Sequence, residues 1–436
     1  MALVLSCLFV CASSSTPYMR VDSAFTSSAG RSSSSGRRVV SLLAADHIHG
    51  RHAFDSVPPV PFPPWYSDPA ILRDRSHVIP ADRGFDYRGT CTDEGGDAVS
   101  LSPTLFEVLA RSTSRIVPFQ DGKVFVKKRS RPIGSPEKDV VEPLFLSYKE
   151  CDATWFGCGG TVSWLGGVES ENEDENDGAL DYFAVDIPSS MNVEPLFRDG
   201  QDYTVESAAV RNYGDSMPSR RHAALLATAN GLLTFHSSHS YCSKCGSLTK
   251  QIKAGSARKC SSDSCGISVY PRIDPAVIML VTSPCREYAL LGRKKSWPSG
   301  RYSTLAGFVE VGETLEECVG RETLEESGVK VDPASIRFSA SQPWPFPRSM
   351  MLGYHATAAL PPSGSDNLPP ISIDPDELED ARWFSKEYVR THGLVEGRGS
   401  SALDFVPDEG EAEFHVPGPA SLARALISEW VGPSDV

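Results

Sequence analysis

Three glutamates in this 436-residue chain stand at a spacing that suits divalent-cation binding. Glu322, Glu325 and Glu326 are related by three and four positions, so on a helix their carboxylates project from one face. Left alone, the three charges would repel one another. Mg²⁺ or Mn²⁺ takes such carboxylate oxygens as ligands and bridges them to substrate phosphates. The usual alternative for a run of glutamates is a solvated helix face.

The residues around these glutamates predict a loop that runs into a helix. Thr314 with a glutamate three residues later has the pattern of a capping box, and Gly328 is typical of the position after a helix end. Glu313, at the end of the loop, is placed to pair with Arg321 and fix the loop on the helix. Gly307 permits the turn of the loop and a close backbone approach.

Four of the eleven cysteines form two close pairs, each followed by glycine. A tight turn at each pair directs two thiolates to one point, which favours a Cys₄ zinc ribbon. Zn²⁺ held by four thiolates has no open coordination position, so we expect a structural ion. Two disulfides are the alternative. The four cysteines are Cys242, Cys245, Cys260 and Cys265.

The segment from Gly307 to Val329 resembles the Nudix box, G-x5-E-x7-R-E-U-x-E-E-x-G-U with U aliphatic, except that Thr323 stands at the first U. The match at this many fixed positions argues against a solvated acidic face. The segment Ser341–Ser349 (SQPWPFPRS) resembles a signature of NADH pyrophosphatases, whose architecture also places a Cys₄ ribbon before a Nudix domain. The resemblance is specific from Arg220 to Trp430 and weak before it.

This resemblance implies an α/β fold. We expect a Nudix α/β/α sandwich on a mixed sheet, preceded by the zinc ribbon and a β-rich N-terminal domain. The expected divisions are a presequence at 1–45, a linker at 46–75, the N-terminal domain at 76–236 with an acidic loop at 169–177, the ribbon at 237–270 and the Nudix domain at 271–436.

The resemblance also implies roles for single residues. Glu322, Glu325 and Glu326 would bind the cations, and Glu325 or Glu326 could accept a proton from water. The family adds a metal ligand before Ala-x-Trp. Here Asp380 holds that position, with Glu379 as the competing candidate.

The implied substrate-binding residues lie on both sides of the box. Tyr270 and Phe308 would line the nucleotide pocket, although both could equally be core residues. Gln342 and Ser349 belong to the proline-rich segment beside it. The structural residues of the box would be Gly307, Glu313, Arg321 and Gly328.

The implied reaction is hydrolysis of the pyrophosphate of NADH or NAD⁺ to nicotinamide mononucleotide and AMP. Mg²⁺ or Mn²⁺ would be the catalytic cofactor and Zn²⁺ the structural one. NAD-capped RNA is a further possible substrate, and a homodimer is the assembly expected from the family. Two alternatives stay open: a hydrolase of ADP-ribose or another nucleoside diphosphate, and an inactive dinucleotide sensor or RNA-binding module.

Composition limits the partners. The 56 acidic and 42 basic side chains give a net charge of −14, which argues against a broad basic surface for nucleic acid. A local basic patch at 293–295 stays possible. After the first dozen residues no apolar run approaches the ~20 needed to span a bilayer, so we expect no membrane segment in the mature protein.

The N-terminus has the composition of a targeting sequence. A short apolar run, Ala2–Ala12, precedes a Ser-rich, Arg-bearing stretch with one acidic residue up to about Ala45. This resembles a signal-plus-transit presequence for a complex plastid, with Ser23-Ala24-Phe25 at the junction. A plain secretory signal before a tail, or a mitochondrial address, is the alternative.

Periodicity predicts the elements that position these residues. Apolar runs indicate short strands in the N-terminal domain and two buried strands after the ribbon. Amphipathic patterns indicate one helix before the ribbon and one near the end. The strands are expected at Lys123–Lys127, Leu144–Tyr148, Asp181–Ile187, Ala276–Val281 and Tyr288–Leu291, and the helices at Arg220–His236 and Pro417–Trp430.

Overall fold

The structure is a computed structural model that describes residues 107–129, 139–156, 160–168, 180–197, 202–360, 368–394 and 414–432. All of them belong to one unit, Ser56–Val436. The expected presequence, linker and acidic loop lie outside the described residues. Within the described part, no helix has the length and apolarity required to cross a bilayer.

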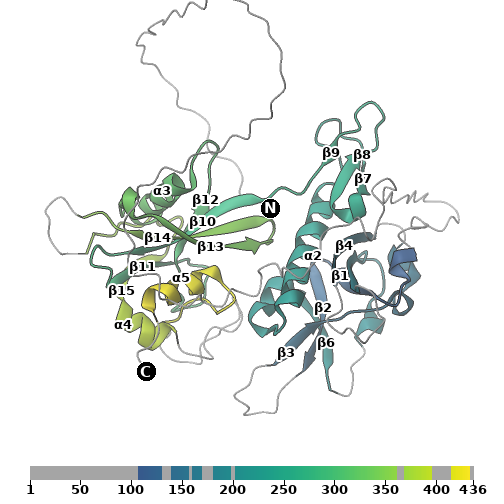
Figure 1. Ribbon diagram of the computed structural model, residues 1–436, viewed down its shortest axis with the longest axis horizontal. Helices are drawn as coiled ribbons and strands as arrows, with labels where there is room; N and C mark the ends of the chain where they lie inside the picture. Colours follow the sequence, from purple (N-terminus) through teal and green to yellow (C-terminus); the bar gives the residue numbers. More distant parts are fainter. Residues whose placement is uncertain are drawn as a thin grey trace, which may run out of the picture. The chain divides into compact units, whose positions relative to one another are not determined.

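The N-terminal domain is built on a six-stranded sheet (Figure 1). Its path is β3-β2-β1-β5-β4, and β6 pairs with β2 along the edge opposite β3. β1 and β5 are parallel, and the other pairs are antiparallel. The strands are β1 (Ser114–Gln120), β2 (Lys123–Arg129), β3 (Val140–Pro143), β4 (Thr161–Val168), β5 (Leu180–Asp186) and β6 (Thr204–Ala209), with 3₁₀ turns η1 (Tyr148–Glu150), η2 (Ala153–Phe156), η3 (Glu194–Leu196) and η4 (Val210–Ser216).

Apolar cores lie on both faces of this sheet because successive strand residues point to opposite sides. Val117 and Phe119 of β1 pack into one core, and Ile116 packs into the other. Helix α2 (Arg220–Ser238) covers the first face with buried leucines such as Leu226. The β-rich N-terminal domain is thereby confirmed.

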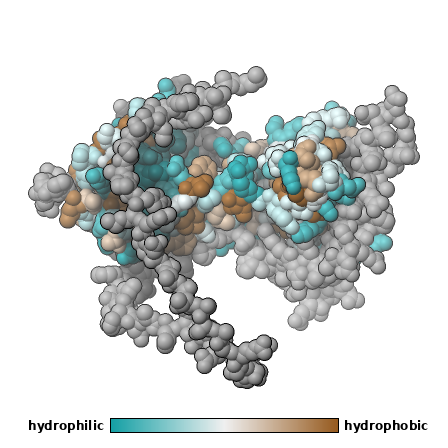
Figure 2. Space-filling model, turned by 90° about the horizontal axis from the view of Figure 1, so that it is seen from above, coloured by the Kyte–Doolittle hydropathy of each residue, from teal (hydrophilic) through white to brown (hydrophobic). Residues whose placement is uncertain are grey.

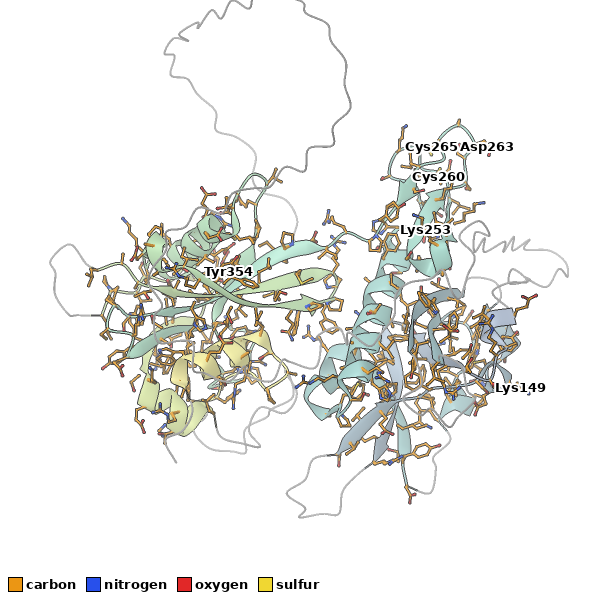
Figure 3. All side chains as sticks on the ribbon, viewed as in Figure 1. Lys149, Lys253, Cys260, Asp263, Cys265 and Tyr354 are labelled. Atoms are coloured by element: carbon orange, nitrogen blue, oxygen red, sulfur yellow. The ribbon has the colours of Figure 1, made fainter. Side chains whose placement is uncertain are left out.

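The zinc ribbon is a three-stranded antiparallel sheet of β7 (Thr249–Ile252), β8 (Ala257–Cys260) and β9 (Ser268–Val269). Its η5 turn (Lys253–Gly255) lies against β4, since a Cβ at Gly255 would meet Ser163 Oγ at 2.7 Å. His236 of α2 donates from Nε2 to the Gly255 carbonyl at 2.7 Å. Figure 3 shows Lys253 at this base of the ribbon and the labelled cysteines at its other end.

The domain expected to have the Nudix fold contains a mixed sheet of order β13-β14-β10-β11-β15, with β12 also paired to β10. β10 and β14 are parallel, whereas its other pairs are antiparallel. The elements are β10 (Asp274–Thr282), β11 (Tyr288–Arg293), β12 (Leu305–Phe308), α3 (Leu315–Ser327), η6 (Pro333–Ser335), β13 (Arg337–Trp344), β14 (Ser349–Thr357), β15 (Asp380–Ser385), α4 (Lys386–Tyr388), η7 (Val389–Gly393) and α5 (Leu422–Val431).

Helices α3 and α5 cover opposite faces of this sheet (Figure 1). Along β10, Val277 and Met279 pack in the core beneath α3, while Ile278 and Leu280 pack beneath α5. This alternation explains why the strand reads as a continuous apolar run. The predicted Nudix α/β/α sandwich with a mixed sheet is confirmed.

Some predicted elements differ in detail. The strand expected at Leu144–Tyr148 is wrong, because the segment forms only an isolated bridge at Leu146 and then enters η1. The proline-rich segment forms the end of β13, a short turn and the start of β14. α5 begins at Leu422, later than the expected Pro417.

Hydrophobic and hydrophilic residues lie side by side over the coloured part of the face in Figure 2. Several large apolar side chains are among the exposed ones. They include Tyr241 and Leu248 on the ribbon, and Phe308 and Val311 beside α3.

Candidate active site and zinc centre

Helix α3 has the ends that its sequence indicates. Thr314 is the N-cap: its Oγ1 accepts a hydrogen bond from Glu317 N at 3.2 Å, and Glu317 Oε2 accepts one from Thr314 N at 2.9 Å. Gly328 follows the helix with φ of 70°, where a left-handed conformation favours glycine. These ends fix where the glutamate-bearing face of α3 begins and stops.

Arg321 joins the loop to the helix. Its Nε and Nη2 donate to the two oxygens of Glu313 at 2.7 and 2.8 Å, and Nη2 also donates to the Phe308 carbonyl at 2.9 Å. Nη1 donates to Glu322 and Glu325 at 2.9 Å each. The guanidinium lowers the pKa of Glu313 to about 2 through its hydrogen bonds, so this carboxylate stays ionised.

Gly307 makes room for Glu322. A Cβ at Gly307 would lie 1.8 Å from Glu322 Cδ and 2.1 Å from both carboxylate oxygens. The carboxyl group therefore occupies the space that any other residue at 307 would fill. Burial raises the pKa of Glu322, against the lowering effect of Arg321.

The structure brings three carboxylates together: Glu322, Glu326 and Glu377, with one oxygen of each within 4.8 Å of the others. Glu326 is 1% exposed, and its Oε2 has no hydrogen-bond partner among the described residues. Burial raises the pKa of Glu326 to about 7, and the neighbouring Glu322 and Glu377 act in the same direction. Glu325 lies outside this trio, half-exposed and paired with Arg321.

Glu377 comes from a segment that also closes the end of α3. Ser372 N donates to the Ser327 carbonyl at 2.8 Å, and Asp374 N donates to the Glu326 carbonyl at 3.3 Å. A Cβ at Gly328 would meet Ser372 at 3.1 Å, so the segment passes close to the helix end. The chain then turns through Asp374 and carries Glu377 to the other two glutamates.

Asp380 and Glu379, the two ligand candidates from the sequence, are bound elsewhere. Asp380 accepts a hydrogen bond from Tyr302 Oη at 2.5 Å and pairs with Arg382 at 2.6 Å. Glu379 pairs with Arg293 at 2.7 Å. The described structure therefore places Glu377, three residues before Asp380, with the box glutamates.

A cavity of about 360 Å³ opens beside Glu326. Its walls include Lys294, Trp297, Arg301 and Trp344, and the Arg301 guanidinium lies 5.4 Å from the Trp297 ring centroid. Indole faces suit stacking of a flat base, and cationic groups suit phosphate. The space is of the size of small-molecule sites.

Gln342 and Ser349 take different positions. Gln342 is buried in the cavity wall, where its Nε2 donates to the Ala420 carbonyl and its Oε1 accepts from Leu422 N, each at 2.9 Å. Both ends of its amide thus hold the start of α5. Ser349 begins β14 and lines a second cavity together with Pro345.

Tyr270 and Phe308 are surface residues, 54% and 60% exposed, so the core alternative does not hold for either. The Tyr270 hydroxyl accepts from Lys253 Nζ at 2.9 Å. Among the residues that line the cavity beside Glu326, neither aromatic is present.

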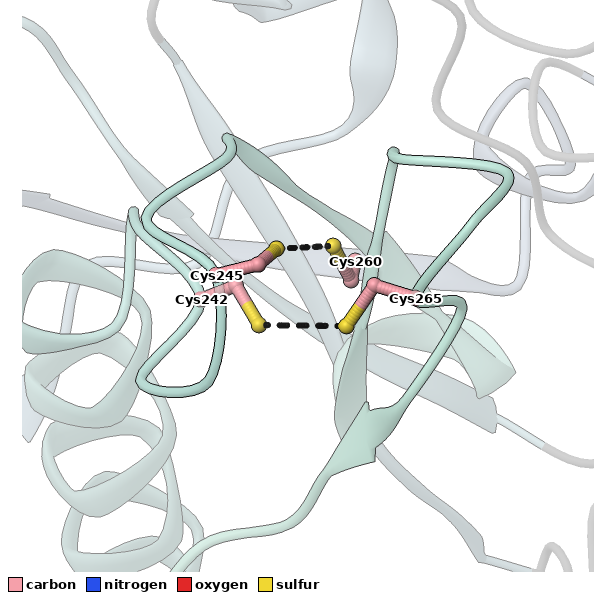
Figure 4. A group of neighbouring side chains, drawn as sticks. All are labelled: Cys242, Cys245, Cys260 and Cys265. Atoms are coloured by element: carbon pink, nitrogen blue, oxygen red, sulfur yellow. Dashed lines mark hydrogen bonds between the residues drawn. The ribbon is translucent and has the colours of Figure 1, made fainter.

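The four predicted zinc cysteines lie in one cluster (Figure 4). Cys242 Sγ is 3.8 Å from Cys265 Sγ, and Cys245 Sγ is 3.4 Å from Cys260 Sγ. A disulfide needs about 2.05 Å between its sulfurs, whereas four thiolates around Zn²⁺ at about 2.3 Å stand roughly 3.8 Å apart. All four are free thiols, and the cluster fits a tetrahedral zinc ion.

The comparisons with known proteins match these two centres. The NUDIX domain model matches residues 272–403, and the NADH pyrophosphatase zinc ribbon domain model matches residues 237–270. "Nudix hydrolase 19, chloroplastic" of Arabidopsis thaliana is 38% identical over 73% of this chain and 78% of its own length. The chain belongs to the zinc-ribbon Nudix hydrolases.

Two human members of this family are also similar. "NAD-capped RNA hydrolase NUDT12" is 35% identical over 62% of this Nudix hydrolase and 54% of its own length. "NAD(P)H pyrophosphatase NUDT13, mitochondrial" is 40% identical over 48% of this chain and 55% of its own length. The chain therefore spans about half the length of these two relatives.

The donor set of this Nudix hydrolase fits a hard divalent cation. Three carboxylates supply oxygen ligands, and no residue in the described part of the chain bonds the buried Glu326 Oε2 to compensate its burial. Sequence reasoning missed Glu377, which stands among five acidic residues in Asp374–Asp380. The only sequence feature that pointed to Glu377 was this acidic run. The path of the segment past α3 decides which of its acidic residues reaches Glu322 and Glu326.

Proposed function

We propose that this chain hydrolyses the pyrophosphate bond of NADH or NAD⁺, giving nicotinamide mononucleotide and AMP. The observation that carries the proposal is the trio Glu322, Glu326 and Glu377 at the edge of a cavity with aromatic and cationic walls. The cluster suits a diphosphate with its cations, and the indole rings suit a base. The names of the human relatives support the substrate class.

The carboxylates of the site would bind the catalytic cation. Glu322, Glu326 and Glu377 would hold Mg²⁺ or Mn²⁺, and Glu325 is the candidate for a further ligand from the same helix face. When bound, the cation would neutralise the diphosphate and lower the pKa of a water ligand. Arg321 holds the loop so that Gly307 stays against Glu322.

Other chain residues would bind and orient the dinucleotide. Lys294 lies close enough to influence the charge of Glu326 and lines the cavity, so it suits a phosphate oxygen. Trp297 and Trp344 offer stacking surfaces. Tyr270 and Phe308, both exposed, are candidates for contacts with the outer part of the substrate. Gln342 shapes the wall through α5.

Substrate assays test the proposal. Purified protein is incubated with Mg²⁺ or Mn²⁺ and with NADH, NAD⁺, ADP-ribose or NAD-capped RNA, and the products are quantified. We expect AMP and the reduced form of nicotinamide mononucleotide from NADH, because hydrolysis leaves the oxidation state of the nicotinamide unchanged. Absence of AMP from NADH contradicts the proposal, and turnover of ADP-ribose alone would favour the nucleoside-diphosphate alternative.

The same site would accept the NAD cap of an RNA, because the bond cleaved is the same. Lys294, which lines the cavity, and Lys295, which follows it in the sequence, supply local positive charge on a chain of net charge −14. Such binding would weaken as salt rises. We also propose a homodimer, testable by light scattering.

We propose an organellar location, with a plastid as the destination. The Ser- and Arg-rich composition of residues 1–45 supports it, as do the names of the chloroplastic and mitochondrial relatives. A fluorescent fusion of residues 1–50 tests it. Plastid fluorescence is expected, and a cytosolic signal would contradict an organellar address.

A further inference from the structure

Two residues in the middle of α2 are poor helix formers. Asn230 and Gly231 stand at positions 11 and 12 of the 19-residue helix, far from both ends. Asparagine and especially glycine disfavour a helix interior, with glycine costing up to about 1 kcal/mol relative to alanine. A compensating contact is therefore expected at this point of the helix.

That contact is with the proline-rich turn between β13 and β14. Asn230 Nδ2 donates to the Pro345 carbonyl at 2.6 Å. A Cβ at Gly231 would lie 3.3 Å from Pro345 Cβ, tighter than most such contacts, so the missing side chain allows the proline to approach the helix. The two unfavourable residues thus meet one proline 115 positions away from Asn230.

The neighbours of Pro345 strengthen this docking. Trp344 and Phe346 both pack against the N-terminal core beneath α2, and their rings meet edge to face with centroids 5.1 Å apart. The docked turn is therefore held by a hydrogen bond, by the close approach of Pro345 to Gly231 and by the packing of two aromatic rings.

The same turn ends in the wall of the catalytic cavity. Trp344 lines that cavity, and Gln342, two residues earlier on β13, fixes the start of α5 on another wall. Arg211 and Gly214 of η4, just before α2, line it as well. A shift of Pro345 would thus move Trp344 and, through Gln342, the residues at the start of α5.

We propose that Asn230 and Gly231 are positioning residues, through which α2 of the N-terminal domain sets the shape of the dinucleotide cavity. They act on substrate binding through Pro345 and Trp344 and do not contact the carboxylate trio. This role rests on the proposed function for its effect on NADH, whereas the docking of the turn stands on the contacts alone.

The test separates docking from helix stability. Gly231→Ala and Asn230→Ala both replace a poor helix former by the best one, so helix propensity alone predicts an α2 that is no less stable. Positioning predicts instead that KM for NADH rises roughly three- to ten-fold, the range for one lost hydrogen bond or close contact, with kcat within about two-fold of wild type. Ser237→Ala is the matched control, since the exposed Ser237 Oγ bonds the carbonyl of Thr234 in the same helix.

Hydrogen exchange gives the readout that needs no substrate. The four amides that this proline-rich stretch has, those of Trp344, Phe346, Arg348 and Ser349, are expected to exchange faster in both variants, with α3 unchanged. Asn230→Asp, which keeps the shape and removes the donor, serves if the alanine variant does not fold. Unchanged exchange, or faster exchange with unchanged KM, overturns the positioning role. A wild-type protein inactive on NADH contradicts the proposed function instead, and the exchange data still decide the docking.

Discussion

At the scale of single residues, the carboxylate trio depends on space as much as on charge. Glu326 is buried with one oxygen that no described residue bonds, and Glu322 lies in the space left by Gly307. Burial raises the pKa of both glutamates, so their shared ionised state is unfavourable without a compensating cation. Cation binding and the burial of these two carboxylates therefore depend on each other.

We predict that Glu377 is a metal ligand and that Asp380 is not. Glu377→Gln and Glu326→Gln should each lower kcat/KM at least about 100-fold, the upper end of what an indirect metal partner costs. Asp380→Asn should lower it far less, because Asp380 bonds Tyr302 and Arg382 outside the trio. Steady-state kinetics with titrated Mn²⁺ measure both. An equal or larger loss in Asp380→Asn would reverse the assignment.

Gly307→Ala should weaken the metal-dependent activity while the fold persists. The added Cβ would meet the Glu322 carboxylate at about 2 Å, so the side chain must leave its position. We expect at least a ten-fold rise in the Mn²⁺ concentration for half-maximal activity, comparable to loss of an indirect metal partner. Gly320→Ala is the control, because a Cβ at Gly320 would have nothing within 4 Å. Gly312→Ala is unsuitable because Gly312 has φ of 89°, which strains any other residue. An unchanged Mn²⁺ concentration for half-maximal activity in Gly307→Ala would contradict the proposal that Gly307 makes room for Glu322.

At the scale of elements, α2 and the ribbon meet at a buried histidine. His236 is 2% exposed, and burial lowers its pKa to about 4. Its Nε2 donates to the Gly255 carbonyl, and its Nδ1 lies 3.2 Å from Arg258 Nη1. Arg258 in turn donates to Thr249 on the neighbouring strand. The neutral imidazole thus ties the helix to two strands of the ribbon.

The pH dependence of stability follows from that lowered pKa. The unfolded chain binds a proton at His236 below about 6.5, whereas the folded chain resists it down to about 4. The contribution of His236 is therefore present above pH 6.5 and is lost as the pH falls toward 4. Urea midpoints at pH 7 and pH 5 should fall more steeply in wild type than in His236→Gln. An equal fall of the urea midpoint in both proteins would contradict this role of His236. Such a fall would reflect only effects that the two proteins share, such as protonation of the zinc thiolates.

The sequence predicted these elements unevenly, for physical reasons. The apolar run of β10 and the capping box of α3 are local signals, and both elements formed where expected. Strand β13 carries Pro343, which argues against a central strand, but β13 is at the sheet edge, where proline is tolerated. Glu377 could not be chosen from the sequence, because its place depends on how Ser372 and Asp374 bond the end of α3.

At the scale of the whole molecule, the ribbon is joined to the N-terminal domain. The η5 turn has left-handed backbone at Lys253 and Ala254, which is uncommon for non-glycine residues. The close packing of Gly255 on Ser163 holds this turn against β4. The zinc cluster, at the other end of the ribbon, fixes the strands that carry the turn.

Zinc removal should therefore loosen the N-terminal domain as well as the ribbon. Chelation, or Cys245→Ser, should speed amide exchange in β4 and β7, with β10 much less affected. Metal analysis should find one zinc per chain in wild type. Exchange confined to the ribbon would show that the two parts are uncoupled, and protein free of zinc when purified without chelators would contradict the zinc assignment.

The segment that carries Glu377 also limits which insertions and deletions the protein can tolerate. It bonds the carbonyls of Glu326 and Ser327 at the end of α3 and places its own carboxylate beside Glu326. One extra residue in α3 would rotate everything beyond it by about 100° and advance it by about 1.5 Å. Such a change after Glu322 would separate Glu326 from the trio and the helix end from its partner segment. The length of α3 between Glu322 and Gly328 should thus be fixed.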